Sequence, residues 1–171
     1  MYPRHFQMFA SYNRWANARL YDAAVKLGEE DFNRDVGAFF KSMCGTLNHV
    51  LVADRIWMRR FACDGPVHTK LDEVPYPAFA ELRAAREAED ARIVAYANTL
   101  DDERLSGTFT YTPITDPREI TQPLAPPLAH FFNHQTHHRG QAHTILTLLG
   151  EDAPPLDLIY YLRTEEGRAF G

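Results

Sequence analysis

The sequence lacks the features that mark several large classes of protein. No apolar run approaches the length of about 20 residues that a membrane-spanning helix needs. The N-terminal segment has no apolar stretch followed by a small-residue cleavage site, so we expect no signal peptide. The net charge is −5, and the lysines and arginines form no cluster in the sequence. Both observations argue against a nucleic-acid-binding surface. We therefore expect neither membrane nor nucleic acid as a partner.

Cysteine is also scarce, with two residues in the chain. Cys44 and Cys63 fall in or beside one predicted helix, which would hold them about 28 Å apart and exclude a disulfide between them. They form no Cys-x-x-Cys motif. Reduced thiols in a cytoplasmic protein are the simplest interpretation.

What the sequence has is the composition of a globular domain, with 45% apolar and 24% charged residues. Its 171 residues suit a single domain spanning 1–171. Apolar residues recur at helical spacing in four segments, which predicts an all-α four-helix bundle. The predicted helices cover 3–27, 39–62, 77–100 and 127–149.

Between the third and fourth helices the pattern changes. Residues 108–112 alternate polar and aromatic side chains, and 119–122 could form a returning strand, so we predict a short β-hairpin or an extended excursion there. This connection is also long enough for a crossover of the bundle. The apolar tail, 154–162, is expected to pack on the bundle or across a dimer interface.

Four of the eight histidines lie within the twelve residues HFFNHQTHHRGQ, from His130 to Gln141. With His134 at zero on a helical wheel, His138 lies at about +40°, His130 at about −40°, Gln141 at about −20° and His137 at about −60°. Neighbouring imidazoles along one stripe of a helix offer a preformed part of a metal site.

The same helical wheel places two further side chains outside this stripe. His143 and Arg139 fall on the other side of the helix, and we expect both of them to face outward.

Inward-facing histidines could serve four kinds of site. The first is a buried hydrogen-bonded network, which needs no ligand. The second is a haem site with a single axial histidine, which remains open although no Cys-x-x-Cys-His motif occurs. The third is a carboxylate-bridged di-iron site, which requires Glu-x-x-His motifs, of which the sequence has none. The fourth is a mononuclear site with three imidazoles and one open position, as catalytic metal sites have.

For such a site we take His134 and His138 as two ligands and weigh His49 and His5 for the third. His5 lies close to the N-terminus, where fraying makes a poor ligand, so we choose His49 in its apolar helix. Gln141 would orient a ligand or a bound water. Imidazoles suit zinc, nickel, iron and manganese alike.

The string NHQTHHRGQ (133–141), the segment YNRWANARLYDAA (12–24) and the segment TLNHVLVADRIWMRR (46–60) together resemble the DinB-like or YfiT-like metal-binding four-helix bundles. The resemblance spans most of the chain in the expected order. It implies one divalent metal bound by three histidines, which correspond to His49, His134 and His138.

In that resemblance His130 and His137 do not match ligands, so we treat them, with Gln141, as residues that support the site or pack beside it. The family includes transferases that use low-molecular-weight thiols such as bacillithiol or mycothiol, and several members are homodimers. The resemblance thus implies a thiol S-transferase acting on an electrophilic small molecule, with a metal-binding stress-response or interaction protein without turnover as the alternative. A mycothiol-dependent maleylpyruvate isomerase also belongs to the family, but such members are usually longer than this chain.

Overall fold

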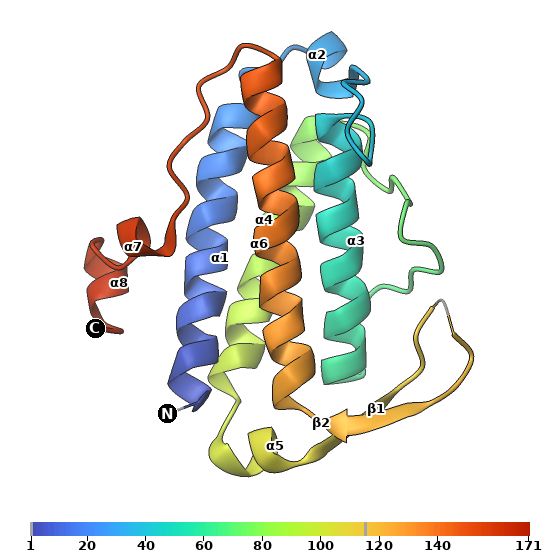
Figure 1. Ribbon diagram of the computed structural model, residues 1–171, viewed down its shortest axis with the longest axis vertical. Helices are drawn as coiled ribbons and strands as arrows, with labels where there is room; N and C mark the ends of the chain where they lie inside the picture. The colour runs from blue at the N-terminus through green and yellow to red at the C-terminus, as the bar shows by residue number, and fades with distance from the viewer. Residues whose placement is uncertain (1, 115) are drawn as a thin grey trace.

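The computed structural model describes residues 2–114 and 116–171, and four long helices dominate it (Figure 1). The predicted four-helix bundle is confirmed, and its helices are α1 (Tyr2–Ala24), α3 (Met43–Ala62), α4 (Phe79–Asn98) and α6 (Ala125–Leu148). The shorter elements are α2 (Glu29–Asn33), α5 (Asp102–Ser106), β1 (Thr108–Tyr111), β2 (Ile120–Pro123), α7 (Leu158–Tyr161) and α8 (Glu165–Arg168).

The helices do not simply alternate in direction. In Figure 1, α1 and α6 run upward while α3 and α4 run downward, so the loop 63–78 must return along the length of the bundle. Both α1 and α3 pack against α4 and α6. The crossover therefore lies between α3 and α4, whereas the connection from α4 to α6 stays at one end of the bundle.

The start of α3 differs from the sequence prediction by four residues. Ser42 caps the helix, and its Oγ accepts a hydrogen bond of 3.1 Å from the Gly45 amide. Lys41, with a φ of 67°, and the preceding Phe40 therefore belong to a tight turn. A β-carbon on residue 45 would collide with the Phe40 carbonyl oxygen, so this turn requires glycine there.

The hairpin is confirmed. β1 and β2 pair antiparallel, from Thr108 opposite Pro123 to Tyr111 opposite Ile120. The sequence prediction missed α5 just before it, although Asp101 is a recognisable cap whose side chain accepts a hydrogen bond from the Arg104 amide. It also missed α2, which lies in the segment taken as a simple connection.

The C-terminal segment packs back on α1. Figure 1 shows α7 and α8 beside this helix, and the Tyr161 side chain is fully buried there against Tyr12 and Trp15. The tail therefore adds its own small hydrophobic cluster to the bundle. In the part of the chain that the structure describes, no helix is both long enough and apolar enough to cross a membrane.

Candidate metal centre

Three histidines from two neighbouring helices meet inside the bundle. His49 lies in the first half of α3, and His134 and His138 lie one turn apart on α6. One ring nitrogen from each lies within 4.8 Å of the other two. The structure thus brings together the three residues that the sequence analysis selected, and this cluster could hold a metal ion.

The orientation of His49 is fixed from both sides of its ring. Its Nδ1 lies 2.8 Å from the Leu71 carbonyl oxygen, which can only accept, so Nδ1 carries the hydrogen. Its ring stacks on Phe40 with 3.8 Å between centroids and 17° between planes. In the neutral imidazole, Nε2 is then left with a free lone pair.

His138 is held in the same way by its own helix. Its Nδ1 lies 2.7 Å from Gln141 Oε1, so this nitrogen donates and Nε2 again carries a lone pair. The two Nε2 atoms, of His49 and His138, face each other at 3.3 Å. A hydrogen-bonded network would need a hydrogen between them, whereas two opposed lone pairs suit a cation.

Burial favours the neutral imidazoles that metal binding requires. It lowers the pKa of His134 to about 3, and the neighbouring histidines His138, His49 and His130 lower it further. It also lowers the pKa of His138 to about 4, against the opposing effect of Gln141, and it lowers the pKa of His49. The three side chains are therefore neutral at physiological pH.

The loop that supplies the Leu71 carbonyl is itself braced. His68 in this loop has a side chain that is only 7% exposed, and its Nδ1 lies 2.7 Å from Glu73 Oε2. The other Glu73 oxygen accepts hydrogen bonds from the Thr69 and Lys70 amides. These contacts lower the pKa of Glu73 to about 2, with the His68 hydrogen bond contributing most. These contacts fix the crossover loop so that the Leu71 carbonyl oxygen stays at hydrogen-bonding distance from His49.

The remaining histidines lie around the centre or away from it. His130 and His137 are exposed, with ring centroids 5.8 Å from His134 and 4.7 Å from His138 respectively. His5 packs edge-on against Phe6 and Phe9 and takes no part in the cluster.

Two expectations concerned side chains that should face outward from α6. His143 is partly covered, and its Nε2 lies 3.1 Å from the Pro154 carbonyl oxygen. Arg139 is only 2% exposed, so the expectation that it faces outward is wrong. It lies over the Tyr12 ring and donates to Asn17 Oδ1, because α6 packs against α1 as well as α3.

A cavity of ≈ 250 Å³ opens beside His134. It lies between α3, α6 and the end of β1, and its lining includes Trp57, Arg60, Tyr111, Ile114, His130 and His134. No motif in the sequence marks Trp57, Arg60 or Tyr111 as part of a site. The Leu71 carbonyl could not have been found, because nothing in the sequence places that loop against α3.

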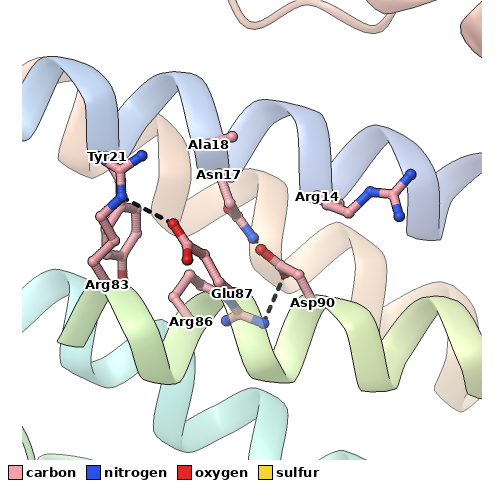
Figure 2. Close-up of a pocket in the computed structure, with 8 residues that line it drawn as sticks. All are labelled: Arg14, Asn17, Ala18, Tyr21, Arg83, Arg86, Glu87 and Asp90. Carbon is pink, nitrogen blue, oxygen red and sulfur yellow. Dashed lines mark hydrogen bonds and ion pairs between the residues drawn. The ribbon is translucent and has the colours of Figure 1, made fainter. Parts of the chain in front are cut away.

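A separate polar cluster joins α1, α3 and α4. Figure 2 shows Arg86 and Asp90 of α4 facing Asn17 of α1. Arg86 Nη1 lies 2.6 Å from Asp54 Oδ2, its Nη2 lies 2.9 Å from Asp90 Oδ1, and Asn17 donates to Asp90 at 2.9 Å. Burial raises the pKa of Asp54 to about 6 against the opposing effect of Arg86.

The many charged residues of the third predicted helix, 77–100, are typical of a solvated face. That interpretation is wrong for Arg86, Glu89 and Asp90, which are buried. Their charges are tolerated because they pair between helices, which helical periodicity alone does not reveal. The cluster includes none of the three histidines, so it is a structural feature distinct from the candidate metal centre.

Comparison with known proteins agrees with this architecture. The DinB family profile matches residues 1–169. Protein DinB of Bacillus subtilis (strain 168) is 24% identical over 164 residues, covering 88% of this chain and 90% of that protein. The crystal structure of a DinB-like protein from Bacillus cereus ATCC 10987 is similar with a TM-score of 0.64 at 17% identity, covering 85% of this chain and 91% of that one, and it supports the fold. With its profile matched along nearly the whole sequence, the chain belongs to the DinB family.

Proposed function

We propose that His49, His134 and His138 bind one divalent metal ion. The observation that carries this proposal is the pair of Nε2 lone pairs, from His49 and His138, that face each other at 3.3 Å. Leu71 and Gln141 hold the corresponding Nδ1 hydrogens, and such partners also make imidazole a better ligand. Zinc, nickel, iron and manganese are the candidate ions, since imidazole accepts all four.

We further propose that the centre is catalytic and acts on a low-molecular-weight thiol. A metal ion bound there would lower the pKa of a coordinated thiol and so supply a nucleophile. Two observations favour this over a purely structural site. Among the described residues, no fourth histidine, cysteine or carboxylate joins the cluster, and a cavity opens beside His134. Structural sites are usually closed by a fourth protein ligand.

The cysteines of the chain offer no obvious alternative nucleophile. Cys44 is buried, and burial raises the pKa of its thiol, so little thiolate forms at neutral pH. Cys63 is exposed at the far end of α3 and does not line the cavity beside His134. In the proposed reaction the thiolate of the cosubstrate attacks an electrophilic small molecule, and the electrophile's leaving group departs with the displaced electron pair.

Metal analysis of purified variants tests the centre. Replacing a residue that only hydrogen-bonds to a metal ligand typically lowers metal affinity roughly 10–100-fold. We expect a larger loss in each of three variants, because each removes a direct ligand: His49→Ala, His134→Ala and His138→Ala. His143→Ala is the matched control on α6 and should retain the metal. Elemental analysis after dialysis against a weak chelator measures this. Full occupancy in the His49→Ala protein would remove that residue from the site.

Turnover separates the enzyme from the second candidate, a metal-binding stress-response or interaction protein without activity. Protein loaded with each candidate metal is mixed with several thiols and monochlorobimane, whose thioether product is fluorescent. We expect a rate above the uncatalysed background with at least one thiol, and loss of that rate in His134→Ala. Background rates with every metal and thiol would favour the non-catalytic candidate. The homodimer implied by the family resemblance stays a prediction, which sedimentation would test.

A further inference from the structure

Arg60 lies in the wall of the cavity beside His134 and is held by two aromatic rings. Its guanidinium carbon lies 4.6 Å from the centroid of Trp57 and 4.9 Å from that of Tyr111. Its Nη2 donates a hydrogen bond of 3.3 Å to the Thr112 carbonyl oxygen, at the end of β1. The guanidinium is therefore positioned before any ligand arrives, which reduces the entropy lost on binding.

This cation has no anionic partner within the described chain. None of the ion pairs within 4.0 Å among the described residues includes Arg60. A guanidinium has five N–H donors, and the hydrogen bond to Thr112 uses only one of its nitrogens. By contrast, the buried Arg86 pairs with Asp54 and Asp90. Arg60 is half-buried, and burial lowers its pKa, so the site gains from an incoming negative charge.

The same cavity joins Arg60 to the histidine centre. His130 and His134 line it together with Arg60, Trp57 and Tyr111, so one small molecule inside it meets both the guanidinium and the metal centre. A volume of ≈ 250 Å³ lies at the small end of ligand pockets. Its aromatic walls suit a short apolar segment between two polar ends.

We propose that this cavity binds a small carboxylate, with its acidic group paired to Arg60 and its other end at the three-histidine centre. The inference rests on the proposed metal site and deepens it by assigning a substrate class. A guanidinium recognises a carboxylate through two parallel hydrogen bonds, which gives orientation as well as affinity. Arg60 is thus the residue that selects an anionic thiol or an anionic electrophile over a neutral one.

The test uses protein loaded with Co²⁺, whose visible spectrum changes when a thiolate binds. It is titrated with ω-mercapto carboxylates of three to six carbons, beginning with 3-mercaptopropionate, and with the matching neutral amides. For at least one length, the carboxylate should bind about tenfold or more tightly than its amide, as expected for a charge-assisted pair. Arg60→Gln should abolish this preference without changing the affinity for the amide, and Arg60→Lys should keep part of it.

Arg104→Gln is the matched control, because Arg104 also stacks on an aromatic ring, 5.0 Å from the Tyr96 centroid, but does not line the cavity. It should keep the full preference. Equal affinities for carboxylate and amide at every length in the Co²⁺-loaded wild type, or a preference that survives in Arg60→Gln, would overturn this inference alone. Failure of the wild type to bind Co²⁺ would overturn the metal site and this inference with it.

Discussion

The suitability of His49 and His138 as candidate metal ligands depends on the atoms behind their rings. In each ring a single acceptor, the Leu71 carbonyl or the Gln141 amide oxygen, holds the Nδ1 hydrogen and turns the Nε2 lone pair inward. The acceptor for His138 lies three residues away on the same helix, so helical spacing predicts it. The acceptor for His49 comes from a loop 22 residues away, so only the folded chain provides it.

The depressed histidine pKa values predict acid sensitivity of the metal-free protein. The folded state keeps His134 and His138 neutral down to about pH 3 and about pH 4, whereas unfolded histidines bind protons below about pH 6.5. Between these limits the unfolded state binds more protons, so stability falls as the pH falls from about 6.5 towards 4. Chelator-treated protein should therefore show a melting temperature that decreases steadily across this range.

Substitution assigns this effect to the cluster. His134→Gln should flatten the dependence of the melting temperature on pH, because it removes one of the protons that only the unfolded state binds. His143 lies outside the cluster, so His143→Gln should show the same dependence of the melting temperature on pH as the wild type. If the melting temperatures of His134→Gln and the wild type fall equally with pH, protonation of His134 does not cause the acid sensitivity.

At the scale of elements, α3 connects both polar features of the bundle. His49 faces α6 in the candidate metal centre, Asp54 pairs with Arg86 of α4, and Arg60 forms part of the cavity wall. A helix with neighbours on several sides buries polar groups on more than one face. His49 and Asp54 find their partners on two different helices, which makes the relative placement of α3, α4 and α6 stringent.

Removing Arg86 should destabilise the bundle strongly. Arg86→Met leaves Asp54 and Asp90 buried without their cation, and breaking such a pair costs about 3–5 kcal/mol in the free energy of unfolding. Arg83→Met is the control on the same helix, since Arg83 pairs with Glu87 and Asp22 near the surface, where each ion pair contributes about 0–1 kcal/mol. Figure 2 shows both arginines. Urea denaturation at pH 8 measures the difference, and equal losses in the two variants would contradict it.

At the scale of the whole molecule, the crossover loop and the hairpin bring residues from outside the four helices to the candidate site. The loop 63–78 travels the length of the bundle and brings the Leu71 carbonyl to His49. The hairpin brings Tyr111 and the Thr112 carbonyl to Arg60. The tail covers Tyr12 and Trp15 of α1. The candidate ligands all lie on helices, and the loop and the hairpin add the Leu71 carbonyl behind His49 and part of the cavity wall.

Periodicity and spacing in the sequence predict the four helices, the hairpin and the histidine stripe of the last helix, because these depend on residues close together in the chain. His49 lies on another helix, and its choice over His5 rests on its apolar helix and on the family resemblance. The twelve residues from His130 to Gln141 place His134, His138 and Gln141 on one side of α6 without help from the rest of the fold. Tertiary structure alone decided that Phe40 lies against His49, that Arg139 and Arg86 are buried, and that Arg60 shares a cavity with His134. The physical reason is that a charged side chain carries no local signal of burial. Its partner, or the lack of one, comes from another helix or loop, and only folding brings the two together.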